Sequence, residues 1–139
     1  MRVAAIATLP AIIATPAASS KSDKQRARDL LRGHLYDRFT ETGVLGETLD
    51  QKLYLCSDGM FIYDTVSFLP DPGTTTTTHA TGRWRVISAH FGHGTARARV
   101  RGVPDGAGQP TTVTFIRDRR GQVTIDGNLV TVEANDKCN

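Results

Sequence analysis

Short stretches rich in β-branched and aromatic residues, separated by Gly, Asp-Gly and Pro, recur along this chain and favour an all-β fold. A capping box at residues 22–25, with Gly33 as a stop signal, indicates a short N-terminal helix. About eight short amphipathic strands leave exposed edges unless the sheet closes, so we expect one small antiparallel β-barrel. The expected strands are 34–41, 48–57, 59–68, 81–91, 95–103, 111–118, 121–126 and 129–134.

The first residues have the organisation of a secretory signal peptide. Arg2 precedes an apolar stretch from Val3 to Ile13, and small residues follow at 14–18. This stretch is well short of the about 20 apolar residues that a transmembrane helix needs. We therefore predict a signal peptide over residues 1–18, a barrel domain over 19–139, and a protein that is secreted, periplasmic or held in the cell envelope. A disordered or buried N-terminus is the alternative.

Cys56 and Cys138 are the only two cysteines of the chain. Two thiols in an oxidising compartment usually pair, so export predicts a disulfide between them. The alternative is a buried free thiol at Cys56 with Cys138 unpaired.

Two hairpins can be placed in register. The turn at 57–59 contains Asp-Gly, and Leu53 and Leu55 are expected to share faces with Phe61 and Tyr63. A second turn at 92–94 defines a register in which paired residue numbers sum to 186. This register pairs Trp84, Val86, Ser88 and His90 with Gly102, Val100, Ala98 and Ala96.

The segment 69–79, which includes Thr74 to Thr78, is rich in Pro and Thr and is predicted to be a long loop. It could be a mobile flap, a glycosylated tip or a simple surface linker.

Charge gives the clearest functional indication. Residues 83–120 hold eight arginines against two aspartates, whereas residues 37–71 hold seven acids against two basic residues. The second hairpin places five of the arginines on one face: Arg83, Arg85, Arg97, Arg99 and Arg101. Like charges across a strand pair are destabilising, so a compensating partner is expected. That partner is either an anionic macromolecule or the acids of neighbouring strands, unless the face is merely solvated.

Three segments occur in an order that resembles a known group of proteins: LCSDGMF at 55–61, GRWRV at 82–86 and QVTIDG at 122–127. They are similar to secreted bacterial domains of unassigned function that form small β-barrels with a lipocalin-like plan. The resemblance spans roughly residues 31–134 and implies that Trp84 plugs one end of the barrel. Lipocalins carry Gly-x-Trp on the first strand, whereas Trp84 lies in mid-chain, so the resemblance implies the architecture alone.

Two functions follow as hypotheses. The first is a secreted binding module that docks an anionic macromolecule, or acts as an inhibitor, through the arginine face. The second is a carrier of a small apolar ligand, which requires an apolar cavity of at least about 300 Å³ that reaches the surface. The chain contains no catalytic signature, so no enzyme, cofactor or metal site is predicted, and the motifs of sequence-specific nucleic-acid readers are absent.

Overall fold

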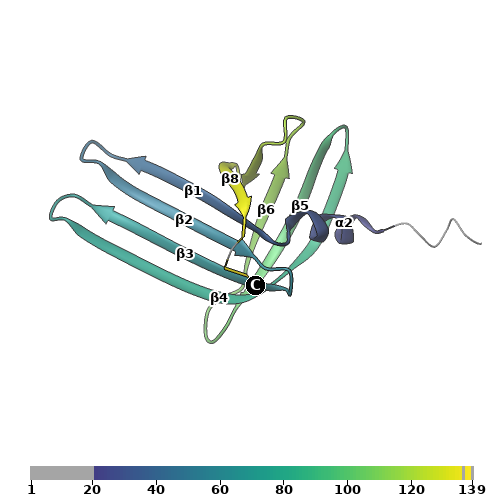
Figure 1. Ribbon diagram of the computed structural model, residues 1–139, viewed down its shortest axis with the longest axis horizontal. Coiled ribbons are helices and arrows are strands. Elements are labelled where there is room, and N and C mark those ends of the chain that lie inside the picture. The colour runs from purple at the N-terminus through teal and green to yellow at the C-terminus, as the bar shows by residue number, and fades with distance from the viewer. Residues whose placement is uncertain (1–20, 136, 139) are drawn as a thin grey trace, which may run out of the picture.

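The computed structural model describes residues 21–135, 137 and 138, and within them eight strands form a closed antiparallel barrel beside one short helix (Figure 1). The elements are α2 (Asp23–Leu31), β1 (His34–Thr42), β2 (Glu47–Leu55), β3 (Met60–Leu69), β4 (Thr74–Gly92), β5 (Thr95–Pro104), β6 (Thr111–Arg117), β7 (Val123–Ile125) and β8 (Asn128–Ala134). Each strand pairs with the next in sequence, and β8 pairs with β1. The predicted fold class is confirmed, whereas the predicted signal peptide over 1–18 lies outside the described residues.

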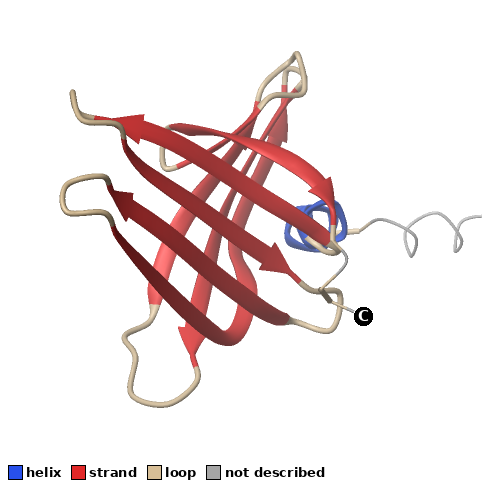
Figure 2. Cartoon of the chain, turned by 60° about the vertical axis from the view of Figure 1, so that its left-hand side comes forward, coloured by secondary structure: helices blue, strands red, loops and turns tan. Residues whose placement is uncertain are grey.

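The barrel consists of two halves that share strand β4. Residues 74–83 of β4 pair with β3, and residues 82–92 pair with β5. Strand β4 bends between these two stretches (Figure 1), and Gly82 lies where the partner strand changes. Any Cβ atom at Gly82 would collide with the Val103 carbonyl oxygen and the Phe61 ring, so only glycine fits there. Strands of the two halves cross at a steep angle (Figure 2). Because β1 contacts β8 only over 34–37, the halves diverge beyond that seam and leave space between them.

Helix α2 covers one end of the barrel (Figure 2). The Ser22 hydroxyl accepts a 3.1 Å hydrogen bond from the backbone N–H three residues on, which caps the helix as predicted. Ala27 and Leu31 are buried against the core cluster that contains Trp84. The Arg28 guanidinium carbon lies 5.1 Å from the centroid of the Trp84 ring. Helix and tryptophan together form the closed end of the barrel.

The tight turns predicted from Gly and Asp-Gly are confirmed. In the β2–β3 turn, Gly59 has a φ of 93°. In the β4–β5 turn, His93 and Gly94 have φ values of 55° and 79°, as a two-residue hairpin turn of this hand requires. The register of the first hairpin is also confirmed, because Leu53 lies opposite Tyr63 and Leu55 opposite Phe61.

The prediction of a loop over 69–79 is wrong. Residues 74–78 begin strand β4 and pair with the end of β3, with Thr74 opposite Leu69 and Thr78 opposite Thr65. The Thr65 and Thr78 hydroxyls are hydrogen-bonded to each other. Threonine is β-branched and suits a strand, and the two prolines are confined to the turn at 70–73. The threonine run is therefore part of a strand, although it follows that turn directly.

The predicted register of the second hairpin holds only for its first half. Trp84 lies opposite Gly102 and Val86 opposite Val100, but a bulge follows at Ile87. The predicted pairs Ser88 with Ala98 and His90 with Ala96 are therefore wrong. Beyond the bulge, the pairs are Ser88 with Arg99, Ala89 with Ala98, His90 with Arg97 and Phe91 with Ala96. Ser88 and His90 thus join the outer face.

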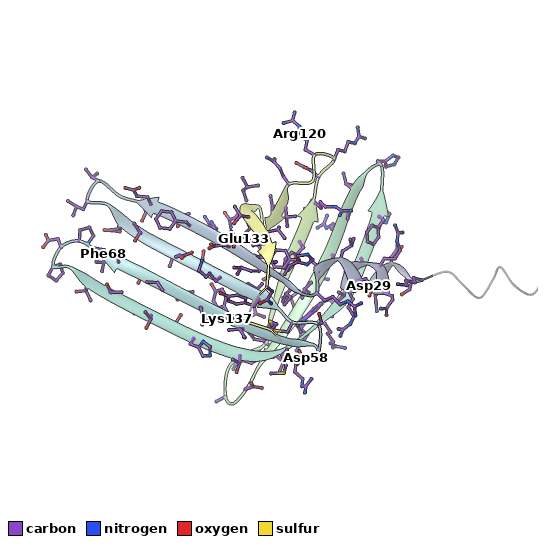
Figure 3. All side chains as sticks on the ribbon, in the orientation of Figure 1. Asp29, Asp58, Phe68, Arg120, Glu133 and Lys137 are labelled. Carbon is purple, nitrogen blue, oxygen red and sulfur yellow. A yellow bond between two sulfur atoms is a disulfide. The ribbon has the colours of Figure 1, made fainter. Side chains whose placement is uncertain are left out.

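The predicted disulfide between Cys56 and Cys138 is present, with the two Cα atoms 5.1 Å apart. It fastens the C-terminal segment across the outer face of β2 and β3. There the Lys137 ammonium lies 3.0 Å from a carboxylate oxygen of Asp64 (Figure 3). The backbone N–H of Asn135 donates a 3.3 Å hydrogen bond to the Gly33 carbonyl oxygen. In the part of the chain that the structure describes, no helix combines the length and the apolar character needed to cross a bilayer.

Candidate functional site: an interior cavity and an arginine face

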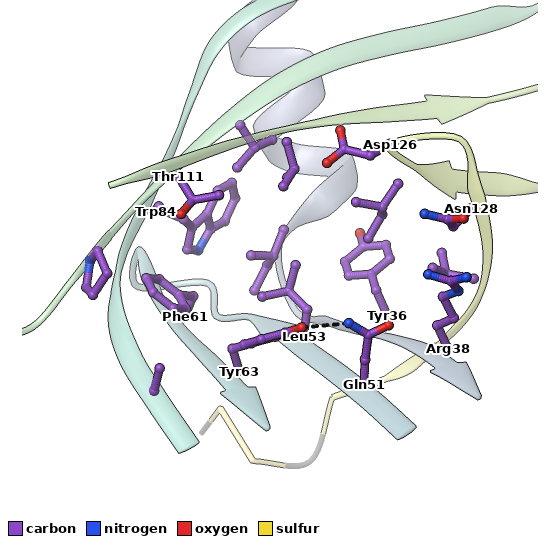
Figure 4. A pocket seen from close by; sticks show the side chains of 18 residues that line it. Tyr36, Arg38, Gln51, Leu53, Phe61, Tyr63, Trp84, Thr111, Asp126 and Asn128 are labelled. Carbon is purple, nitrogen blue, oxygen red and sulfur yellow. Dashed lines mark hydrogen bonds between the residues drawn. The ribbon is translucent and has the colours of Figure 1, made fainter. Parts of the chain in front are cut away.

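A cavity of about 460 Å³ lies between the two halves of the barrel (Figure 4). Its lining is mostly apolar and comes from strands of both halves, from β1 through β8. The lining residues are Tyr36, Arg38, Gln51, Leu53, Leu55, Phe61, Tyr63, Ala80, Trp84, Val100, Gly102, Pro104, Thr111, Val113, Ile125, Asp126, Asn128 and Val130. Because the halves diverge beyond the β1–β8 seam, the cavity extends toward the open end.

The inner end of the cavity is formed by buried rings. Tyr36, Phe61 and Trp84 are only 3%, 8% and 4% exposed, and they close off the space toward the helix. The Tyr36 hydroxyl donates a 2.9 Å hydrogen bond to the Leu31 carbonyl oxygen. Burial raises the pKa of Tyr36, so this ring stays neutral. The aromatic residues fill the closed end of the barrel without filling the space beyond it.

Polar side chains gather at the opposite end of the cavity. Arg38 on β1 lies directly opposite Gln51 on β2. The Gln51 amide donates a 2.8 Å hydrogen bond to the Tyr63 hydroxyl oxygen, which leaves the hydroxyl proton available to a further acceptor. Across the cavity, the Asp126 carboxylate accepts a 2.8 Å hydrogen bond from the Thr114 backbone N–H. The cavity therefore joins an apolar interior to a polar rim.

Arg38 is the one cationic side chain among the residues that line this cavity. Within the described residues it forms no ion pair, although the Asp126 carboxylate lines the same space. Figure 4 shows its side chain beside Asn128 at the polar end. The rim can thus offer charge-assisted hydrogen bonds to the polar end of a ligand.

The five predicted site arginines share the outer face of β4 and β5. Arg85 lies directly opposite Arg101, as expected, and Arg99 and Arg97 lie on the same face because side chains alternate along β5. Four of the five are exposed and Arg101 is half-buried. We call these five residues the arginine face: Arg83, Arg85, Arg97, Arg99 and Arg101.

Acids of neighbouring strands do not compensate the arginine face. Across the described residues, none of its five members forms an ion pair. The aspartates nearest in sequence are engaged elsewhere. Asp105 accepts a 2.8 Å hydrogen bond from the Thr81 hydroxyl, and Asp118 accepts two 2.9 Å hydrogen bonds from backbone N–H groups of its own turn. The structure thus pairs no member of the arginine face with an acid of an adjacent strand, and a solvated face is the alternative to an external partner.

Three aspartates on the outer face of β1–β3 are paired with cations of the same face, of β4 or of the C-terminal segment. The Lys52 ammonium lies 2.7 Å from an oxygen of Asp37 and 3.4 Å from one of Asp50. Asp64 contacts both His79 and Lys137. Burial and the adjacent Asp37 carboxylate raise the pKa of Asp50. For Asp37, burial is outweighed by hydrogen bonds from Asp50 and Lys52, so its pKa is lowered.

The sequence predicted the arginine face and the disulfide, but it did not identify the rim of the cavity. Strict alternation along β1 and β2 places Arg38 and Gln51 on the same inner face as Tyr36 and Leu53, and this periodicity was the available signal. The size of the cavity depends on how far the two halves diverge, which no local pattern encodes. No family model, curated protein or solved structure matches this chain.

Proposed function

We propose that this protein is an exported binding protein that holds a small, largely apolar molecule in the cavity between its two halves. The cavity of about 460 Å³ carries the proposal. Ligand pockets typically have volumes of about 300–1,000 Å³, mostly apolar walls and a few placed polar groups. This cavity combines those properties, since rings form its inner end and Arg38, Gln51 and Asn128 lie at its rim.

The arrangement favours an amphipathic ligand that enters with its apolar part first. An apolar group gains by leaving water for the space beside Trp84 and Phe61. A polar or anionic end group would stay at the rim, near the Arg38 guanidinium and the Tyr63 hydroxyl. A charged group buried at the inner end would find no cation there, and its desolvation would oppose binding.

Two features support a site of action outside the cytoplasm. The disulfide between Cys56 and Cys138 is typical of proteins that mature in an oxidising compartment. The apolar leader at 1–18, with small residues at its end, favours export. A closed antiparallel barrel of eight strands is also an architecture that can hold one small ligand.

The test is a titration of the mature protein with N-phenyl-1-naphthylamine, a neutral apolar dye that fluoresces in apolar surroundings. We expect saturable binding by the wild type. Ala80→Phe places a ring in the cavity from the inner face of β4 and should reduce the affinity at least about tenfold, because the ligand and the ring compete for the same volume.

Thr77→Phe is the matched control, because it adds a ring to the same strand on its outer face, where Thr77 is exposed. It should leave dye binding unchanged. Equal affinities for wild type and Ala80→Phe, with both proteins folded by circular dichroism, would contradict binding in the cavity. So would the absence of saturable binding to the wild type by this dye and by dodecanol.

A further inference from the structure

The unpaired cations of the arginine face define a second binding surface, separate from the cavity. Arg97, Arg99 and Arg101 alternate along β5, so their Cα atoms span about 13 Å on one side of the strand. Arg83 and Arg85 lie beside them on β4. The cavity lies on the other side of the same strands, where Val100 and Gly102 line it. A ligand on the arginine face therefore does not compete with one in the cavity.

None of the described acids forms an ion pair with this surface, so an anion that neutralises it would come from elsewhere. On the outer face of β1–β3, Asp37, Asp50 and Asp64 are paired with cations of that face or of the C-terminal segment. The five arginines form no ion pair in the described part of the chain. Arg85 and Arg101 even lie directly opposite one another, and such a like-charged pair is destabilising until an anion neutralises it.

The residues around the arginines indicate the class of the partner. Ser88 lies opposite Arg99 on β4, and Thr112 and Thr114 lie opposite Arg101 and Arg99 on β6, so hydroxyl groups alternate with guanidinium groups. Hydroxyls and guanidinium groups bind sulfate, carboxylate and sugar hydroxyl oxygens.

The same surface lacks the side chains that other anionic partners need. Among the described residues of β4 beyond the bend and of β5 and β6, no Phe, Tyr or Trp lies on the outer face, because Trp84, Phe91 and Phe115 belong to the core. Bases of single-stranded nucleic acid stack on such rings, and Trp and Tyr are two of the three residue types enriched at the energetic centres of protein interfaces. A row of exposed arginines with hydroxyl neighbours fits a linear chain whose charges are its main feature.

We propose that the arginine face binds a linear anionic polysaccharide that carries sulfate or carboxylate groups. The polymer would lie along β5, with its acidic groups bound by the five guanidinium groups and its sugar hydroxyls hydrogen-bonded to Ser88 and the β6 threonines. Binding of this kind is reversible and weakens as salt screens the charges.

The experiment compares two triple variants of the mature protein on immobilised heparin and polygalacturonate. Arg97→Gln/Arg99→Gln/Arg101→Gln alters the arginine face. Arg117→Gln/Arg119→Gln/Arg120→Gln removes the same number of charges at the β6–β7 turn, where Arg120 lies at the tip (Figure 3). We expect the first variant to lose at least about tenfold in affinity on one or both polymers and to elute at lower salt, and the second to lose less than about threefold.

Two further controls test whether the variants are folded and whether the partner is a polysaccharide. Arg97→Lys/Arg99→Lys/Arg101→Lys keeps the charges and should retain salt-sensitive binding, with an unchanged thermal unfolding temperature as the check on folding. Neutral dextran should not bind. Equal losses of affinity in the two Gln variants would show that net charge alone determines binding, and would overturn the proposal. Tighter binding of an oligothymidylate or of poly-glutamate than of either polysaccharide would overturn the assignment to polysaccharide.

Discussion

The Trp84 indole nitrogen donates a 3.0 Å hydrogen bond to the Cys56 carbonyl oxygen, so the ring that fills the closed end is attached to a residue of the disulfide. Trp84 is only 4% exposed, and the Arg28 guanidinium lies above its ring. One side chain therefore links the helix, the β2–β3 turn and the C-terminal segment.

Trp84→Phe should destabilise the protein by about 2–4 kcal/mol, because it leaves a void and an unsatisfied buried carbonyl group. Urea unfolding followed by circular dichroism measures the change. His90→Phe, an exposed position on the same strand, serves as the control and should change the free energy of unfolding by less than about 0.5 kcal/mol. Equal stability of Trp84→Phe and wild type would contradict this role.

Gly82→Ala should destabilise the barrel by more than about 2 kcal/mol. A methyl group at this position would collide with the Val103 carbonyl oxygen and the Phe61 ring at the bend of β4. Gly106→Ala tests the effect of losing a glycine elsewhere, because a Cβ there would meet no atom within 4 Å, although its φ of 81° carries some strain. A larger loss at Gly106 than at Gly82 would show that close packing at the bend is not the cause.

Arg38→Gln should weaken binding of dodecanoate by about tenfold and leave binding of dodecanol unchanged. The reason is that a charge-assisted hydrogen bond at the rim is lost, while the apolar walls of the cavity are intact. Displacement of the naphthylamine dye measures both affinities, and Arg99→Gln on the outer face should change neither. An equal effect on the acid and the alcohol would place the end group away from Arg38.

Asp50→Asn should make the protein more stable near neutral pH. Burial and the Asp37 carboxylate raise the pKa of Asp50 in the folded state, so the folded protein binds this proton more tightly than the unfolded chain does. The resulting stabilisation is complete below the pKa of an unfolded aspartate. That contribution is lost as the pH rises through the raised value. Urea unfolding at several pH values should show an advantage of the variant that disappears in acid.

Asp37→Asn is the control, because it should change the stability at neutral pH in the opposite direction. The lowered pKa of Asp37 stabilises the fold above the pKa of an unfolded aspartate, and this stabilisation is lost as the pH falls through the native value. The variant should therefore be less stable than wild type at neutral pH. Changes of the same sign in both variants would contradict the assignment of the two carboxyl groups.

Cys56→Ser/Cys138→Ser should lower the free energy of unfolding by about 4 kcal/mol, because the disulfide joins residues 82 positions apart and restricts the unfolded chain. Wild type unfolded in the presence of a reductant should match the variant. A variant as stable as the oxidised protein would show that the C-terminal segment is held by its other contacts.

The sequence predicted those parts of the fold that depend on local signals. Asp58-Gly59 and His93-Gly94 have the backbone requirements of tight turns, and Ser22 has those of a helix cap, so these elements were placed correctly. Val86 and Val100 were also paired correctly, since the count from the turn and the alternation of faces agree at that point. In each case the residues that determine the structure lie within one short segment.

The parts that could not be predicted depend on how distant segments meet. The bulge at Ile87 places Ala89 and Phe91 on the inner face in place of Ser88 and His90, and it cannot be deduced from the hairpin alone. The strand at 74–78 forms because β3 is long enough to pair with it. The cavity results from the bend at Gly82 and the short seam between β1 and β8, which are tertiary features.

The position of the disulfide also bears on how the protein can be immobilised on a surface. Cys138 and helix α2 both belong to the closed end, so a surface linkage made at α2 or beside Cys138 leaves the rim around Arg38 pointing away from the support. An immobilised sample should therefore accept ligand as freely as one in solution, which makes biosensor chips with end-point attachment a suitable format for the assays above.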